Sequence, residues 1–139
     1  MIVVDTDVVS ELMKPSPSAA VAAWVRAQTG NEVHTTSITL AEILHGIARL
    51  PDGRRKDLLL TTASDVFASF ADQVLPFDAG AAVQYAQVVG GRDRLGLPID
   101  GFDAQIAAIC RARGATLATR NLKDFSHTDV TLIDPWQHA

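Results

Sequence analysis

Short apolar runs and amphipathic segments alternate along the chain. The β-branched run at 2–4 stops at Asp5 and is typical of a strand buried on both faces of a parallel sheet. Apolar residues at helical spacing predict a helix over 38–50, directly after a short β-branched run at 33–36. The same patterns predict further strands at 74–77, 115–119 and 130–133, and further helices at 7–13, 18–28, 56–71, 79–89 and 102–113.

Glycines indicate where several of these elements end. Gly114 closes the helix over 102–113, and the pair Gly90 and Gly91 predicts that the preceding helix stops at 89. Strands that alternate with helices favour an α/β sandwich with a mainly parallel central sheet flanked by helices. In such sheets ligands bind outside the carboxyl ends of the strands. Acidic residues that directly follow strands are therefore the first candidates for chemistry.

Composition limits the class of protein. With 139 residues and 47% hydrophobic side chains, the chain fits one globular domain over 1–139. No apolar stretch reaches the ~18 to 20 residues of a membrane span, and no basic flank with an apolar run opens the sequence, so we expect neither a membrane protein nor an exported one. The single cysteine, Cys110, rules out an internal disulfide and favours the cytoplasm.

Net charge argues against nonspecific attraction of a polyanion. Twelve Lys and Arg residues against sixteen Asp and Glu residues give a net charge of −4. A nucleic-acid substrate would have to be held by a local basic patch or through a metal ion. Arg120 and Lys123 follow the fourth predicted strand, flank the proposed site and are the basic candidates for phosphate contacts.

Four acids lie where strands meet helices. Asp5 ends the first strand, Glu42 lies early in the helix after the second strand, Asp103 begins the helix before the fourth strand, and Asp124 follows that strand. In a parallel sheet these positions can converge at one edge. Clustered carboxylates repel one another unless a cation joins them, and hard oxygen ligands suit Mg²⁺ or Mn²⁺.

Each acid also has an ordinary structural interpretation. Asp5 could cap the helix that follows it, and Glu42 lies on the less apolar face of its helix, where a solvated surface charge is common. Asp103 could serve only to favour a helix start, with Asp100 competing as the cap. Asp124 precedes an aromatic residue in a turn, where local capping acids are frequent.

Four short motifs follow one another along the chain: IVVDTDVVS at 2–10, SITLAEILHG at 37–46, FDAQIAA at 102–108 and LATRNLKDF at 117–125. In this order and spacing they resemble the motifs of PIN-domain ribonucleases, most closely the VapC-like toxins of bacterial toxin–antitoxin pairs. The resemblance covers the whole chain. It implies a PIN-like three-layer sandwich.

The resemblance also implies a function. It points to a Mg²⁺- or Mn²⁺-dependent endoribonuclease that hydrolyses RNA with water activated by the metal. Asp5, Glu42 and Asp103 match the family's first three acids, and Thr6 and Thr119 match hydroxyl positions near the metal. The implied partners are RNA, a cognate antitoxin that inserts into the active-site groove, and a second copy of the chain in a homodimer or a higher toxin–antitoxin assembly.

This sequence departs from the family pattern at the fourth acid. Where many members carry an acid two residues after the threonine of the fourth strand, this chain has Asn121. An amide oxygen can bind a cation but brings no charge, so we expect Asp124 to complete the metal site, directly or through water. Asp7 stands where an asparagine is frequent, which adds negative charge.

Two other functions remain open from the sequence. The segment from Asp5 to Val9 also resembles the nucleophile motif of haloacid-dehalogenase-type phosphatases, in which the first aspartate attacks phosphorus. No lysine after a later strand and no acidic pair matches the rest of that pattern. The other alternative is a PIN-like module that binds without catalysis.

Overall fold

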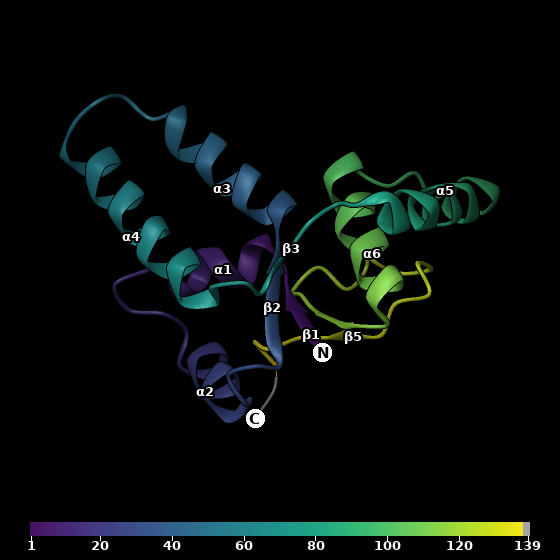
Figure 1. The fold of residues 1–139 in the computed structure, drawn as a ribbon, viewed down its shortest axis with the longest axis horizontal. Coiled ribbons are helices and arrows are strands. Elements are labelled where there is room, and N and C mark those ends of the chain that lie inside the picture. Colours follow the sequence, from purple (N-terminus) through teal and green to yellow (C-terminus); the bar gives the residue numbers. More distant parts are fainter. Residues whose placement is uncertain (138–139) are drawn as a thin grey trace.

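Five short strands form one parallel sheet (Figure 1), and in sheet order they are β3 (Val74–Leu75), β2 (Val33–Thr36), β1 (Ile2–Val4), β4 (Thr116–Ala118) and β5 (Leu132–Ile133). The computed structural model describes residues 1–137, so the last two residues of the predicted domain lie outside the described range. In register, Val3 of β1 lies opposite His34 on one side and Leu117 on the other. Every strand pair in the described part of the chain is parallel, which confirms the predicted α/β class.

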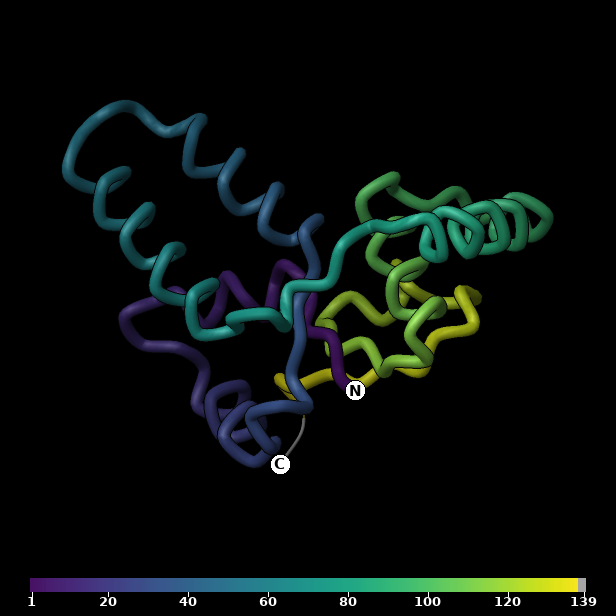
Figure 2. Tube along the Cα trace, viewed as in Figure 1, coloured from purple at the N-terminus to yellow at the C-terminus, as the bar shows by residue number. Residues whose placement is uncertain are grey.

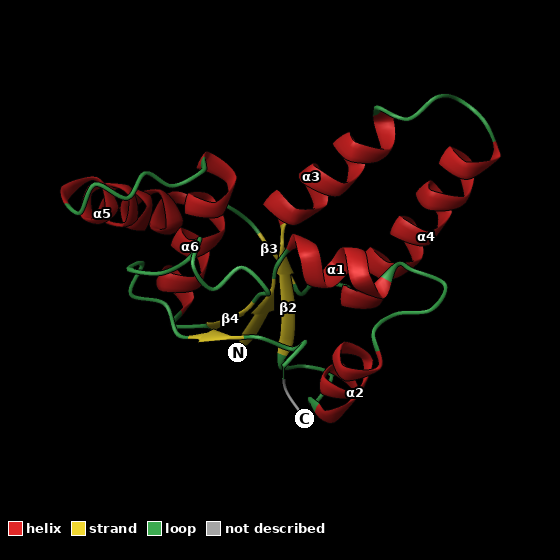
Figure 3. Ribbon diagram, turned by 180° about the vertical axis from the view of Figure 1, so that it is seen from behind, coloured by secondary structure: helices red, strands yellow, loops and turns green. Residues whose placement is uncertain are grey.

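Helices cover both faces of the sheet, and within residues 1–137 they are α1 (Thr6–Leu12), α2 (Ala19–Ala27), α3 (Ser37–Ala48), α4 (Arg54–Phe70), α5 (Ala79–Arg94) and α6 (Gly101–Arg113). Because successive strand residues point to opposite faces, Val3 packs in a core with α5 and α6, whereas Val4 packs in a core with α1 to α4. Figure 3 shows the strands between these two groups, as the predicted three-layer sandwich requires. None of these helices combines the length and hydrophobicity that a bilayer crossing needs.

Helices α3 and α4 form a hairpin that projects from the sheet. Figure 2 follows the chain outward along α3, around a loop, and back along α4. Ile43 and Ile47 of α3 and Ala63 of α4 are buried in the same core. The hairpin therefore forms one wall of the molecule on the face opposite α5 and α6.

The predicted end of α5 was wrong. The helix continues through Gly90 and Gly91 to Arg94, and Gly96, with φ of 68°, makes the turn instead. Glycine inside a helix costs about 1 kcal/mol relative to alanine, which other contacts can offset. Here the side chain of Arg92, which is 6% exposed, donates hydrogen bonds to backbone carbonyls beyond the helix. The edge strands β3 and β5 are shorter than predicted, with two residues each.

The sheet order places a crevice beside β1. The chain passes from β1 outward to β2 and β3, then returns to the other side of β1 as β4 and continues to β5. The strand order therefore reverses between β1 and β4. In open α/β sheets, ligands bind at this reversal, outside the carboxyl ends of the strands.

Candidate active site

A polar cavity opens at the carboxyl ends of β1 and β4. Its volume is about 350 Å³, and it is lined by residues from β1, α1, α3, α6 and the segment after β4: Asp5, Thr6, Asp7, Glu42, Asp100, Phe102, Asp103, Ile106 and Asn121. The structure thus brings three of the four predicted acids to one place. A larger apolar cavity of about 540 Å³ between α1, α3 and α4 shares Thr6 and Glu42 with it. The carboxylates gather in the smaller cavity, which we take as the candidate active site.

Asp5 combines a structural and a chemical role. Its Oδ1 accepts a hydrogen bond from the Val8 amide at 3.1 Å and so caps α1, while the side chain is only 3% exposed. Burial raises the pKa of Asp5 to about 7, although hydrogen bonds from Thr119 and Val8 lower it. The cap interpretation of Asp5 is therefore correct, and it places the carboxyl group in the cavity.

Glu42 is held by α1 rather than left in solvent. Helix α3 begins after Thr36, whose hydroxyl accepts a hydrogen bond from the Thr39 amide at 3.1 Å. One helical turn further on, Oε1 of Glu42 accepts a hydrogen bond from the Thr6 hydroxyl at 2.8 Å. Partial burial raises the pKa of Glu42, and the nearby charges of Asp100 and Asp7 act in the same direction. Glu42 is therefore a half-buried side chain with a partner in α1, and not a fully solvated surface charge.

Asp100 and Asp103 have different roles at the start of α6. Asp100 is the cap, since its Oδ1 accepts hydrogen bonds from the amides of Phe102 at 2.9 Å and Asp103 at 3.4 Å. The Asp103 carboxylate accepts no hydrogen bond from residues 1–137. Burial first, then the charges of Asp100 and Glu42, raise its pKa to about 6. Asp103 is thus free to bind a ligand in the cavity.

No cationic side chain within the described range neutralises these acids. The ion pairs formed by residues 1–137 involve Glu32, Glu11, Asp52 and Asp78 instead. No three Asp, Glu, His or Cys side chains in that range already form a metal-ligand group. Mg²⁺ is commonly bound through only one or two carboxylates and keeps several waters. The oxygen donors of the cavity and their mutual repulsion therefore fit a hydrated divalent cation.

Asn121, not Asp124, lines the cavity at the fourth position. The Asn121 amide group donates a hydrogen bond to Oδ2 of Asp7 at 2.7 Å, and its backbone N–H donates to the Thr119 hydroxyl at 2.9 Å. Asp124 is exposed and is not among the residues around the cavity. Its charge still contributes to the raised pKa of Asp103. Asp124 is therefore close enough to act through space.

Residues 2–130 match the sequence profile of the PIN domain. The chain belongs to the PIN-domain family. The match confirms the family resemblance, and it leaves the haloacid-dehalogenase-type alternative without support because it covers the segment that suggested it.

Relatives and solved structures match this PIN domain over most or all of its length. It is 37% identical over 140 residues to VapC ribonuclease Y4jK of Sinorhizobium fredii, with 100% of each chain covered. It is 30% identical over 101 residues, 73% of each chain, to tRNA(fMet)-specific endonuclease VapC of Shigella flexneri. The crystal structure of FitAcB from Neisseria gonorrhoeae superposes with a TM-score of 0.91 at 35% identity, covering 99% of each chain.

Of the four predicted substrate or phosphate contacts, Thr6 lines the cavity, whereas Thr119 and the two basic residues, Arg120 and Lys123, do not. The Arg120 guanidinium carbon lies 4.3 Å from the centre of the Trp136 ring, and its charge helps to lower the pKa of Glu11, after the larger effects of the Lys14 and Ser18 hydrogen bonds. Lys123 is exposed. Because neither residue lines the cavity, the structure does not bring them to the acids.

Asp7 and Asp100 complete the cavity without having been selected as site residues from the sequence. Asp7 lies in the first turn of α1, two residues after Asp5, and Asp100 is the residue before α6. Both positions are also those of ordinary helix-capping acids, which conceals a second role. The signal in the sequence was the repeated pairing of acids, Asp5 with Asp7 and Asp100 with Asp103.

Proposed function

We propose that this PIN domain is a Mg²⁺- or Mn²⁺-dependent endoribonuclease and the toxin of a toxin–antitoxin pair. The observation that carries the proposal is the meeting of Asp5, Glu42 and Asp103, from three separate elements, in one cavity without a counter-charge from the described residues. The names of the relatives, VapC ribonuclease and tRNA(fMet)-specific endonuclease, support RNA as the substrate. We expect the reaction to take place in the cytoplasm.

The metal would be held by carboxylate oxygens of Asp5, Glu42 and Asp103. Once bound, a divalent cation lowers the pKa of a water molecule and neutralises charge on the scissile phosphate. Asn121 can add its amide oxygen, and Asp124 can act through water or through space. Thr6 fixes the Glu42 carboxylate by donating its hydrogen bond at 2.8 Å.

The raised pKa values define the state of the acids before metal binds. With a pKa of about 7, Asp5 carries its proton on a large fraction of molecules at neutral pH. Binding of a cation favours the ionised carboxylates, so metal binding releases protons. Metal affinity should therefore rise with pH through the range from about 6 to 7.

The neighbouring apolar cavity fits the proposed antitoxin partner. It is lined by apolar side chains of α1, α3 and α4, among them Met13, Ile43, Ile47 and Leu59, and it reaches Thr6 and Glu42. A segment of the antitoxin seated there would cover the carboxylates. The solved complexes FitAcB and FitAB bound to DNA support such a partner. The homodimer and a higher assembly remain predictions from the family.

Cleavage of labelled RNA with and without metal tests the proposal. We expect the wild-type protein to cut RNA with Mg²⁺ or Mn²⁺ and to stop in EDTA. Asp103→Asn should abolish cleavage, whereas Asp65→Asn, which neutralises an exposed acid of α4, should leave it unchanged. A wild-type protein that cuts no RNA with either metal would be a non-catalytic binding module. Release of phosphate from a small monoester would indicate a phosphatase instead.

Expression in cells tests the toxin role. We expect the chain alone to arrest growth, and co-expression of the neighbouring reading frame to relieve the arrest. Asp103→Asn expressed at the same level should be harmless. Harmless expression of folded wild-type protein would contradict the toxin role.

A further inference from the structure

One buried arginine joins two irregular segments beside the active site. Arg92 lies in the last turn of α5, and its side chain donates four hydrogen bonds to backbone carbonyls. Nε donates to Leu97 at 2.8 Å and Nη2 to Pro98 at 3.1 Å. Nη1 donates to Asp124 at 2.9 Å and to Ser126 at 2.7 Å. The first two acceptors precede α6, and the other two follow β4.

The form of this contact requires a guanidinium group. Arg92 forms no ion pair with any of residues 1–137, so its buried charge is stabilised by carbonyl oxygens alone. The planar group has five N–H donors in a fixed fork, and this geometry reaches both segments at once. A lysine keeps the charge but has three donors at one point, so it cannot span the same four acceptors.

Both joined segments lead directly to residues of the cavity. The segment with Leu97 and Pro98 runs into α6, which carries Asp103. The other segment begins with Asn121, three residues before Asp124. Neither segment is a helix or a strand, so the sheet does not fix their separation. Asp5, by contrast, is fixed by its own backbone N–H, which donates to the carbonyl of Ala118 in β4 at 3.1 Å.

We propose that Arg92 is a positioning residue that sets the distance between Asp103 on α6 and Asn121 after β4, and thereby the affinity of the cavity for a divalent cation. The proposal rests on the proposed function, since it assigns these residues to a metal site. Groups that hold metal ligands in place from outside the coordination sphere affect metal affinity or activity by about 10- to 100-fold when they are removed. Arg92 does not line the cavity, so its effect passes through the two segments.

Mn²⁺ binding measured by calorimetry, without RNA, tests this role directly. Arg92→Gln should weaken Mn²⁺ binding by about 10- to 100-fold and raise the metal concentration for half-maximal RNA cleavage by a similar factor. Arg92→Lys should restore folding and charge but only part of the Mn²⁺ affinity. Arg94→Gln is the matched control, because it removes the same charge from an exposed site two residues away on α5. Its Mn²⁺ affinity should equal that of the wild type.

Hydrogen exchange of the metal-free protein gives a second readout. Loss of the four Arg92 hydrogen bonds should increase the exchange of backbone amides in residues 95–103 and 119–126 together, while the amides of α3 stay protected. If Arg92→Gln does not fold, Arg92→Lys decides. Variants that bind Mn²⁺ as the wild type does, whatever their melting temperature, would make Arg92 purely structural and overturn the proposal. If Mn²⁺ binding depends on Arg92 as expected but the wild type cuts no RNA, the proposed function, and not the role of Arg92, would be overturned.

Discussion

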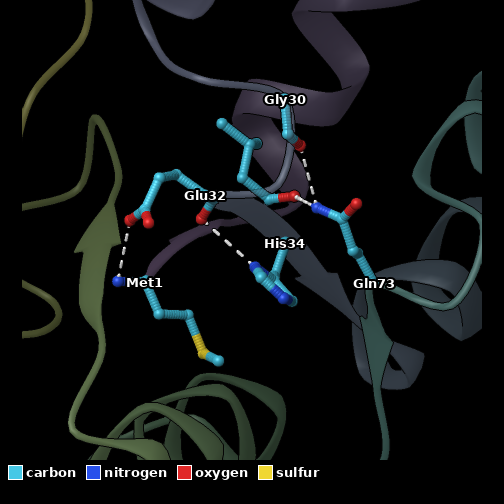
Figure 4. A network of polar contacts seen from close by, with 6 residues as sticks. Met1, Gly30, Glu32, His34 and Gln73 are labelled. Carbon is cyan, nitrogen blue, oxygen red and sulfur yellow. Dashed lines mark hydrogen bonds and ion pairs between the residues drawn. The ribbon is translucent and has the colours of Figure 1, made fainter.

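The two edges of the sheet both carry polar side chains next to strand ends, but within residues 1–137 only the amino edge pairs a negative charge with a positive one. At the amino edge, Met1, Glu32 and Gln73 each directly precede a strand, and each makes a polar contact to the residues around the start of β2 (Figure 4). The amino group of Met1 pairs with Glu32 at 3.1 Å, and the Gln73 amide group donates to the carbonyls of Gly30, at 3.0 Å, and Val33. The Met1 amino group, the Glu32 carboxylate and the Gln73 amide nitrogen therefore each have a partner within the protein.

At the carboxyl edge the acids face each other instead. Asp5 directly follows β1, and Asp103 lies in the first turn of α6. Burial raises the pKa of Asp5 to about 7 and that of Asp103 to about 6. Folding has thus buried these carboxyl groups next to other acids, and both effects disfavour their ionised forms. A protein gains no stability from such a cluster, so the cluster indicates an external cation. The comparison shows that unsatisfied charge, rather than polarity itself, separates the site from the rest of the molecule.

The largest expected effect comes from exchanging one glutamate at each edge. Glu42→Gln should reduce RNA cleavage by at least about a hundredfold, because it removes a proposed metal ligand. Glu32→Gln removes the partner of the Met1 amino group at the opposite edge and should leave cleavage unchanged. Steady-state cleavage of a labelled RNA at saturating Mn²⁺ compares the two. Equal losses in both variants would show that the edges do not differ in function.

The second prediction concerns stability without metal. Below about pH 3, well under the unfolded pKa of 3.8, Asp5 is protonated in both the folded and the unfolded chain. As the pH rises from 3.8 toward 7, the unfolded chain ionises first, so Asp5 withdraws stability from the native state until it ionises as well. Asp5→Asn keeps a good helix cap and should therefore stabilise the metal-free protein at pH 8 by about 2 to 4 kcal/mol.

Urea unfolding in EDTA at about pH 3 and at pH 8 measures this difference. The two proteins should be about equally stable at the lower pH, and Asp5→Asn should be the more stable at pH 8. Addition of Mn²⁺ at pH 8 should stabilise only the wild type. A variant that is less stable than the wild type at both pH values would mean that Asp5 serves structure alone.

The third prediction tests the satisfied edge. Gln73→Ala leaves the carbonyls of Gly30 and Val33 without the hydrogen bonds of the Gln73 amide group. We expect a loss of about 1 kcal/mol in the free energy of unfolding and no change in the metal concentration for half-maximal cleavage. Thermal melting and a Mn²⁺ titration measure the two quantities. A shift in the metal requirement would show that the amino edge is coupled to the site.

The apolar pattern of the sequence was sufficient for the fold but not for every boundary. Buried β-branched runs identified β1 and β2, and Gly114 ended α6 in the left-handed conformation with φ of 61°. The end of α5 was missed because local glycine preference was outweighed by the contacts of Arg92, whose partners lie up to 34 residues away. Such contacts cannot be inferred from local propensity.

The site was predictable where an acid directly follows a strand and uncertain where a loop carries the residue. The topology of a parallel sheet brings to one edge Asp5, the start of the helix after β2 and the start of the helix before β4, so convergence could be expected for Glu42 and Asp103. Asn121 and Asp124 lie in an irregular segment, where spacing along the sequence does not determine direction. The hydrogen bond from Asn121 to Asp7 links residues 114 positions apart, which no local pattern predicts.

The smallest expected effects come from that irregular segment, and they decide whether Asn121 or Asp124 is the fourth ligand of the proposed metal site. Asn121 lines the cavity, whereas Asp124 is exposed, so Asp124→Asn should raise the metal requirement only as far as a charge acting through solvent allows, by about twofold. Asn121→Asp adds a carboxylate inside the cavity and replaces a hydrogen bond to Asp7 with repulsion. It should therefore destabilise the metal-free protein and strengthen Mn²⁺ binding by about fivefold, which corresponds to ~1 kcal/mol of Coulomb attraction in water-like surroundings. A calorimetric titration in which Asp124→Asn weakens Mn²⁺ binding strongly, while changes at Asn121 have no effect, would assign the fourth ligand to Asp124.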